Sequence, residues 1–392
     1  MLGLEPEVLL HHRRVRGEIG FGQLGGVHGG ADCIQGLQGV ACLHKGGCQT
    51  RDCEAKCALD PRGPRPWPCL WMFTARGPRP ARRQRQDMQD AADDMALDEV
   101  ERRSWHEPQA QQCVCCGSHS LSSAPAVLMP FVAERIQGVG KVEIDASWQL
   151  QTVPQGHAMH LCQSLVCGEC GLLFLDKRFS DGEMARLYGG YRGEAYTAQR
   201  EHHEPGYRLR NEALAAGTSH IPEVESYLVS QLGRLPVSVL DWGGDTGRNT
   251  PFRGKVEDVR IYDISGQDVL PGCRRIGRDE ALGGQHELVV LSQVLEHLPY
   301  PGRELKKLRE CLGPDSRLYV ELPLETLMRG PQDQRVAPQS KRHWHEHINF
   351  FSAMSLRRLM TRCGLEVLDL RPATLTVEGK EVWIWQLLAK LA

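Results

Sequence analysis

Short apolar runs alternate with amphipathic stretches through the second half of the chain, and this pattern predicts strands that alternate with helices. Candidate strands are residues 238–241, 259–263, 288–291, 318–322, 365–370 and 381–388. Helical spacing is clearest at residues 303–311 and 355–363, and residues 221–236 have the pattern of an amphipathic helix. Strand–helix alternation is typical of a doubly wound α/β fold around a mostly parallel sheet. We therefore expect such a fold over residues 237–392.

The rest of the chain has other patterns. Residues 1–94 scatter glycine, arginine, proline and cysteine with no period of 2 or 3.6. They are expected to be a disordered extension, or to lie upstream of a true start at Met88 or Met95. Residues 176–236 are helical in pieces and carry four tyrosines near their start, so we expect a helical lead-in there.

Charge and hydropathy restrict the class of partner. The 47 basic and 49 acidic residues nearly cancel, which gives no whole-chain argument for nucleic acid or for an anionic membrane. No apolar run approaches the roughly 18–20 residues that a membrane span needs. The sequence "HHRRVR" interrupts any signal-peptide core at once, so a cytoplasmic location is the default expectation.

Two cysteine pairs mark a candidate metal site. Cys113 and Cys116 form one CxxC pair, and Cys167 and Cys170 form a second, each followed directly by glycine. Paired CxxC turns aim four thiolates at one point, which is the donor set of a closed structural zinc site. We predict a small zinc-binding module over residues 108–175, with free cysteines as the alternative.

The segment after the first predicted strand suggests a nucleoside cofactor. The strand ends on Asp241 and breaks into a turn that contains Gly243, Gly244, Asp245 and Gly247. Asp263 follows 22 residues after Asp241, where an acid can bind ribose hydroxyls. A carboxylate at position 245 would repel a pyrophosphate. S-adenosylmethionine has no phosphate and carries a sulfonium and an ammonium, so the turn suits it better.

These motifs resemble class I S-adenosylmethionine-dependent methyltransferases. Residues 241–247 resemble the family's first motif, and "HELVVLSQVLEHLPYPGRELKKLRECLGPDSRLYVELP" resembles its fourth strand, the following helix and its fifth strand. The resemblance implies a seven-stranded sheet and makes Gln293 a further candidate cofactor residue. The sequence departs from the family at Asp245 and at His286, which stands where the family has an acid.

A cluster of ionisable residues follows the fifth strand. His345, Glu346 and His347 should lie on a loop at the cofactor edge of the sheet, together with His343. A histidine oriented by a carboxylate is a competent general base at neutral pH. A metal site is less favoured, because His345 and His347 would face opposite ways on an extended segment. A purely structural role, with one histidine capping the next helix, is the other alternative.

The order of zinc module, tyrosine-rich helix and "WHEHINFFS" resembles the zinc-containing sugar C-methyltransferases of deoxysugar biosynthesis. That resemblance implies His347 as the base, Glu346 as its partner and an upstream tyrosine, Tyr196 or Tyr191, as a further catalytic residue. Trp344 stands where the family has tyrosine, and the family's additional C-terminal domain is expected to be absent.

The sequence thus predicts an S-adenosylmethionine-dependent methyltransferase that modifies a nucleotide sugar or another saccharide, at carbon or oxygen, and that holds a structural zinc. The alternative is a non-catalytic, zinc-stabilised binding protein with a degenerate methyltransferase fold. Nucleic-acid modification ranks lowest, because the cysteine-pair region has almost no lysine or arginine.

Overall fold

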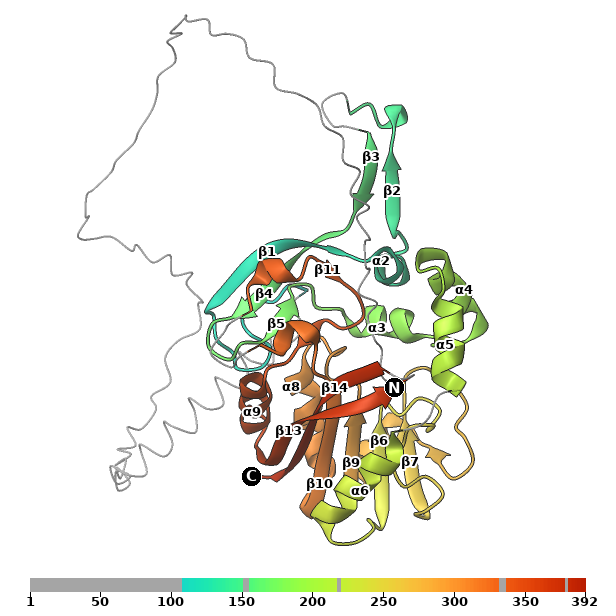
Figure 1. The fold of residues 1–392 in the computed structure, drawn as a ribbon, viewed down its shortest axis with the longest axis vertical. Coiled ribbons are helices and arrows are strands. Elements are labelled where there is room, and N and C mark those ends of the chain that lie inside the picture. The colour runs from blue at the N-terminus through green and yellow to red at the C-terminus, as the bar shows by residue number, and fades with distance from the viewer. Residues whose placement is uncertain (1–107, 151–154, 217–219, 331–335, 378–379) are drawn as a thin grey trace, which may run out of the picture. The chain divides into compact units, whose positions relative to one another are not determined.

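The computed structural model describes residues 108–150, 155–216, 220–330, 336–377 and 380–392. The predictions for residues 1–94 lie outside these ranges. The main element is a seven-stranded sheet whose strands lie in the order β13-β14-β10-β9-β6-β7-β8 (Figure 1). The strands are β6 (Ser238–Trp242), β7 (Asp258–Tyr262), β8 (Arg274–Arg275), β9 (His286–Ser292), β10 (Leu312–Pro323), β13 (Leu365–Val377) and β14 (Lys380–Leu391).

The sheet is mixed and has a reversal of strand order at its centre. β6 pairs in parallel with β7 on one side and with β9 on the other, and β10 continues in parallel beside β9. β14 is antiparallel to both β10 and β13. In open α/β sheets, ligands bind outside the carboxyl ends of the strands at such a reversal. The fold therefore directs attention to the carboxyl ends of β6 and β9.

Helices cover both faces, as the continuous burial of the central strands requires. Val239 packs with α6 (Ile221–Leu232), whereas its neighbour Leu240 belongs to the core on the opposite face. That second face carries α7 (Arg278–Gly283), α8 (Pro301–Leu308) and α9 (Ala353–Arg362). The seven-stranded α/β prediction is confirmed, and six of its strands match predicted segments.

Two details differ from the predicted alternation. No helix connects β6 to β7; residues 243–257 form turns instead. Four glycines and a proline in this stretch explain the difference, since both residue types oppose a helix interior. β8 was not predicted, because its two residues are both arginines and carry no apolar signal.

A separate five-stranded sheet has the order β11-β1-β4-β5-β12, and the two cysteine pairs lie in turns next to it, one before β1 and one between β4 and β5. Three of its strands come early in the sequence: β1 (Leu121–Leu128), β4 (Leu161–Cys167) and β5 (Leu173–Leu175). The two outer strands, β11 (His343–Trp344) and β12 (Asn349–Phe350), come from the predicted acid–base segment, far along the chain (Figure 1). β11 runs parallel to β1, and β12 runs antiparallel to β5.

The remaining elements connect or flank the two sheets. They are α2 (Pro130–Gln137), the hairpin β2 (Lys141–Ile144) and β3 (Gly156–Met159), and the helices α3 (Asp181–Tyr188), α4 (Glu194–His203) and α5 (Tyr207–Ala216). Short 3₁₀ turns lie at Ala146–Trp148, Arg309–Cys311, Thr326–Met328 and Pro338–Ser340. Within the described ranges, no helix combines the length and apolar character that crossing a membrane requires.

Candidate active site

The glycine turn after β6 is built so closely that side chains are excluded. Gly243 has φ +86°, and its amide donates to the carbonyl of Tyr262 over 2.7 Å. A Cβ on Gly243 would lie 2.6 Å from Val294 Cγ2. A Cβ on Gly244 would lie 2.6 Å from Asp241 Oδ2. The turn is thus held against the ends of β6 and β9, and at Gly243 and Gly244 it has no room for a side chain.

Asp245 and Asp263 meet at this edge. The amide of Asp245 donates to Asp263 Oδ2 over 2.9 Å, and the amide of Ser265 donates to Asp263 Oδ1 over 2.6 Å. Burial and the neighbouring Asp263 charge raise the pKa of Asp245. Two adjacent carboxylates disfavour an anionic ligand and favour hydroxyl or cationic groups.

Buried polar atoms without partners gather at the same edge. They include Asp241 Oδ1, Gln293 Oε1 and both carboxylate oxygens of Glu296. Burial raises the pKa of Asp241 and that of Glu296 to about 7 each. Native proteins rarely leave buried polar atoms unpaired, so such a group indicates a place for a polar ligand. The residues present therefore fit a cofactor with several hydrogen-bonding groups.

His347 lies next to this edge, buried and oriented by a carboxylate. Its Nδ1 is 2.9 Å from Glu325 Oε1, just beyond the end of β10. Glu296 and His297, in the turn after β9, lie beside it, and the ligand atoms of the three groups are within 4.8 Å of one another. This arrangement suits proton transfer, and its spacing would also suit a cation.

His297 is held neutral. Burial lowers its pKa to about 3. Its Nδ1 lies 2.8 Å from Tyr188 Oη and 3.0 Å from the carbonyl oxygen of Glu346. Its ring packs edge-on against that of His347, with centroids 4.8 Å apart. The site thus contains two imidazoles whose surroundings differ.

Glu346 faces away from His347, which differs from the predicted pairing. Its carboxylate accepts from Tyr196 Oη over 2.6 Å and from Arg200 Nη1 over 2.7 Å. Although burial opposes ionisation, the Arg200 charge holds the pKa of Glu346 well below its usual range. The structure brings Tyr196 and Glu346 together, as part of a buried ion-pair network, and gives His347 a different partner, Glu325.

His345 also belongs to that network. It pairs with Glu204 at the end of α4, and its Nδ1 lies 3.5 Å from Glu346 Oε2. Burial would lower the pKa of His345, but the bonds to Glu204 and Glu346 raise it. His345 and His347 therefore face opposite ways, as alternation on an extended segment predicts.

A buried arginine fixes the segment that carries these residues. Arg178 Nη1 donates to Asn349 Oδ1 and to the carbonyl of Pro299, each over 2.9 Å. Asn349 Nδ2 donates in turn to the carbonyl of Leu298 over 2.7 Å. The amide of Ile348 donates to the carbonyl of Glu296 over 2.8 Å. These bonds join the turn after β9 to the strand β12, so His297 and His347 are positioned together.

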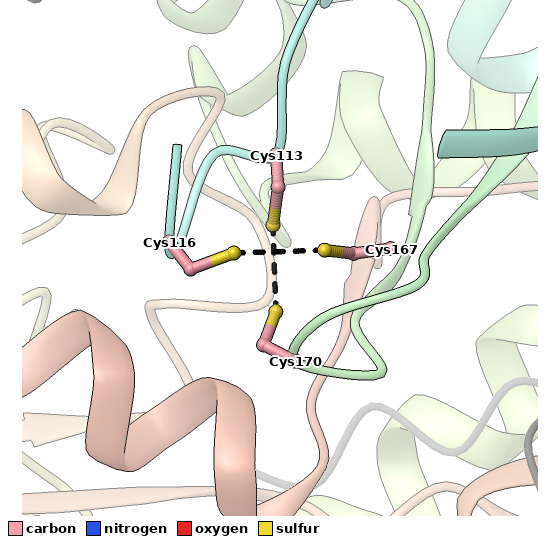
Figure 2. A group of neighbouring side chains, drawn as sticks. All are labelled: Cys113, Cys116, Cys167 and Cys170. Carbon is pink, nitrogen blue, oxygen red and sulfur yellow. Dashed lines mark hydrogen bonds between the residues drawn. The ribbon is translucent and has the colours of Figure 1, made fainter. Parts of the chain in front are cut away.

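The four predicted metal ligands meet at one point. The sulfurs of Cys113 and Cys170 are 3.5 Å apart, as are those of Cys116 and Cys167. Figure 2 shows the four side chains pointing toward a common centre from two turns, and all four sulfurs lie within 4.8 Å of one another. Tetrahedral zinc with Zn–S distances of about 2.3 Å needs a spacing of this size.

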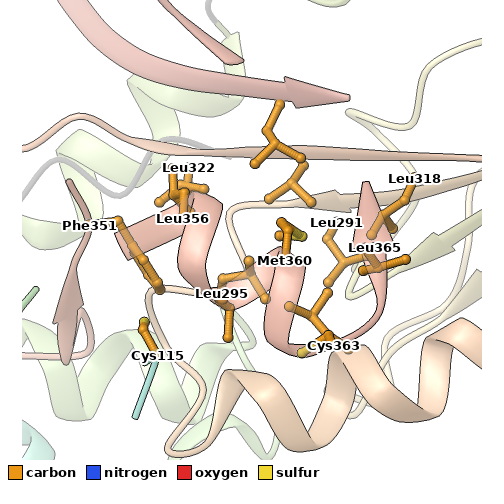
Figure 3. Packing of buried hydrophobic residues seen from close by; sticks show 14 of the residues in the cluster. Cys115, Leu291, Leu295, Leu318, Leu322, Phe351, Leu356, Met360, Cys363 and Leu365 are labelled. Carbon is orange, nitrogen blue, oxygen red and sulfur yellow. The ribbon is translucent and has the colours of Figure 1, made fainter. Parts of the chain in front are cut away.

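The cysteine cluster packs into the hydrophobic core between α9 and the seven-stranded sheet. Cys115, between the first two ligands, is fully buried with Phe351 and Leu295 (Figure 3). Ser352 Oγ, at the N-cap of α9, donates to the carbonyl of Cys170 over 2.6 Å. The cluster thus shares one hydrophobic core with α9 and the sheet.

Four site residues were not predicted: Glu296, His297, Glu325 and Tyr188. Glu296 and His297 lie four and five residues beyond the end of β9, whereas Asp263 comes immediately after β7, so the rule used for Asp263 selects them only if it is extended along the turn. Glu325 follows β10 in the same way. Tyr188 had no signal in the sequence beyond its place in a tyrosine-rich segment.

Comparison with known proteins gives the class. Residues 208–370 match a family model described as "Methyltransferase domain". The protein is therefore an enzyme of the methyltransferase type. No curated protein matches the chain.

Solved structures with a similar fold include the glycopeptide N-methyltransferase MtfA complexed with sinefungin, which is 16% identical, with a TM-score of 0.35 over 45% of this chain and 95% of that one. Another is the Burkholderia thailandensis 1,6-didemethyltoxoflavin-N1-methyltransferase, 18% identical, with a TM-score of 0.33 over 44% of this chain and 78% of that one.

Proposed function

We propose that this enzyme transfers the methyl group of S-adenosylmethionine to a saccharide or nucleotide sugar, with His347 as the general base. The observation that carries the proposal is the pair of buried His347 and half-buried Glu325 beside a glycine turn rimmed by Asp245 and Asp263. His347 with Glu325 can remove a proton, and Asp245 with Asp263 can hold a nucleoside that has no phosphate.

The choice of cofactor is supported by the turn itself. A pyrophosphate is normally bound by the amides at the start of a helix, and no helix follows this turn. Asp241, Asp245 and Asp263 surround the turn, and they favour the ribose hydroxyls and the cationic sulfonium and ammonium groups. When bound, the cofactor would supply an electrophilic methyl group.

The chain's own residues would act on the acceptor. Glu325 accepts the Nδ1 proton of His347, which leaves Nε2 able to take a proton from the acceptor. Removal from a carbon beside a keto group would give an enolate, and removal from a hydroxyl would give an alkoxide. Tyr188 Oη lies 2.8 Å from Nδ1 of neutral His297, and this hydrogen-bonded pair has one donor left for an acceptor oxygen, either the tyrosine hydroxyl or Nε2 of His297.

A saccharide acceptor is supported by the polar character of this edge and by the "WHEHINFFS" resemblance, and the resemblance extends to the cysteine cluster. We further propose that the four thiolates of Cys113, Cys116, Cys167 and Cys170 bind a structural zinc. Four thiolates close the coordination sphere, so this zinc would take no part in the reaction.

The test is calorimetric titration of the full chain with S-adenosylmethionine, with NADH as a control ligand, followed by turnover assays with a panel of nucleotide sugars. We expect S-adenosylmethionine to bind and NADH not to bind. His347→Ala should lower turnover by about 10²- to 10⁴-fold, the usual contribution of a general base, and leave cofactor affinity within a few-fold.

His157→Ala, on the exposed strand β3, is the matched control and should keep full turnover. Failure of the wild-type chain to bind S-adenosylmethionine would overturn the proposed cofactor. Normal turnover by His347→Ala would overturn the assigned base.

A further inference from the structure

The segment between α3 and α4 links the acid–base cluster to the cofactor turn. At one end, Tyr188 Oη lies 2.8 Å from His297 Nδ1. At the other end, a Cβ on Gly193 would lie 3.7 Å from Gln267 Nε2, in the segment just beyond Asp263. Residues 188–193 therefore pass over the edge where the cofactor is proposed to bind.

Arg192 lies in the middle of this segment and has an unusual environment. Its φ is +61°, a left-handed backbone conformation that residues other than glycine rarely adopt. Its Nε is buried and has no hydrogen-bond partner. Its guanidinium lies over the ring of Tyr191, 4.9 Å from the centroid. Within the described ranges, it forms no ion pair with a carboxylate within 4.0 Å.

The charge of Arg192 nevertheless acts on the cofactor turn. Burial and Asp263 raise the pKa of Asp245, and the Arg192 charge opposes this rise. The Arg192 charge thus acts on Asp245 although the two side chains form no ion pair. This separation of a positive and a negative group matches a zwitterion, such as the ammonium and carboxylate of an amino acid.

We propose that Arg192 binds the carboxylate of the amino-acid end of S-adenosylmethionine, with Asp245 on the side of the ammonium. The proposal rests on the proposed cofactor and adds to it a residue that selects for the carboxylate. The planar guanidinium can hold a carboxylate through two parallel hydrogen bonds, one of them from the unpaired Nε.

The test compares two ligands that differ only in the carboxylate: S-adenosylmethionine and decarboxylated S-adenosylmethionine. Each is titrated calorimetrically into the full chain and into Arg192→Ala. We expect the variant to bind S-adenosylmethionine about 10- to 100-fold more weakly, the usual loss for a hydrogen bond to a charged group. Its affinity for the decarboxylated ligand should change by less than about threefold.

Two further variants separate recognition from folding. Arg192→Gly removes the guanidinium and also relieves the left-handed backbone, so it should show the same ligand selectivity without a folding penalty. Arg192→Lys should recover part of the affinity, because it keeps the charge but not the fork.

Arg275→Ala is the matched control. Arg275 also has a buried, unpaired nitrogen near this edge, and its Nη1 lies 3.4 Å from the carbonyl oxygen of Asp263. Any effect there should be equal for both ligands.

The outcomes are distinct. Equal weakening of both ligands by Arg192→Ala and Arg192→Gly, or no weakening of either, would overturn the role of Arg192 and leave the proposed cofactor intact. Absence of S-adenosylmethionine binding by the wild-type chain would overturn the proposed cofactor itself.

Discussion

The cysteine cluster and the cofactor edge are both buried assemblies of chemically reactive groups, yet they are built in opposite ways. Around the cysteines, the turns repeat each other: the amides of Gly117 and Gly171 donate to the carbonyls of Cys113 and Cys167 over 2.8 and 3.0 Å. In the described residues before position 192, no buried polar side-chain atom lacks a partner. The cofactor edge has unpaired buried atoms at Asp241, Arg192, Gln293 and Glu296.

This difference separates a structural site from a functional one. A closed thiolate set satisfies itself once a metal is bound and exposes nothing to a substrate. The cofactor edge keeps hydrogen-bonding groups unsatisfied and backbone strained at Arg192, Asp245 and Gln293, all of which have positive φ. The energetic cost of these unpaired atoms and strained residues is offset only when a ligand supplies the missing hydrogen-bond partners. Substitutions at either site test this difference.

The largest effect is expected from Cys167→Ser. Loss of one thiolate opens the tetrahedral set, so we expect the bound metal content to fall from one equivalent to near zero. The free energy of unfolding should fall on the order of 5 kcal/mol, less than for an isolated zinc finger because the cluster shares the core of the larger domain. Elemental analysis and urea unfolding measure the two quantities.

Cys115→Ala is the control for that experiment. Cys115 is fully buried, like Cys113 and Cys167, but lies outside the four-sulfur set. The Cys115→Ala variant should lose some stability and keep its metal. Retention of metal by Cys167→Ser would refute the four-thiolate assignment.

A smaller effect is expected at the cofactor edge from Glu296→Gln. Burial raises the pKa of Glu296 from 4.5 to about 7 in the folded protein, so the folded state holds this proton more tightly than the unfolded state. Wild-type stability from this group is therefore full below about pH 4.5 and decreases as the pH rises to about 7.

The decrease corresponds to about 3 kcal/mol and should be absent from the glutamine variant, which does not ionise. Urea unfolding of both proteins at pH 5 and pH 8 measures it. The free energy of unfolding of the variant, relative to that of the wild type, should increase as the pH rises. A constant difference between the two proteins would show that Glu296 does not titrate in this window.

The smallest effect is expected from Gly244→Ala. The new Cβ would lie 2.6 Å from Asp241 Oδ2, so the turn must shift. Overpacking of this kind costs about 1–3 kcal/mol, which predicts cofactor binding about 10- to 100-fold weaker. Gly277→Ala, where no atom lies within 4 Å of the added Cβ, should bind normally. Unchanged calorimetric affinity of Gly244→Ala would contradict close approach of the cofactor to this turn.

The sequence predicted most of the sheet because its central strands are continuous apolar runs buried on both faces, as at residues 288–291. It failed where local signal was weak. β11 and β12 have two residues each, and they pair with strands that lie more than 150 residues earlier. No periodicity within the segment can specify such a distant partner.

The candidate site shows the same limit. Asp241, Asp245 and Asp263 were predicted because a strand, a turn and a fixed spacing determine where they lie. The pairing of His347 with Glu325 was not predicted, because it depends on how the segment between β11 and β12 is held by Arg178 and Asn349. Sequence proximity favoured Glu346, which tertiary contacts turn toward Tyr196 instead.

The two late strands of the cysteine-bearing sheet also determine when that sheet can form during synthesis. β5 ends at Leu175, but β12 ends at Phe350, roughly 175 residues later. At about 5–20 residues per second, the ribosome needs about 10–35 seconds to supply the missing edges. During that interval the apolar faces of β1, β4 and β5 lack their final neighbours. The sheet that begins near residue 121 is therefore completed only when the C-terminal half of the chain supplies its outer strands.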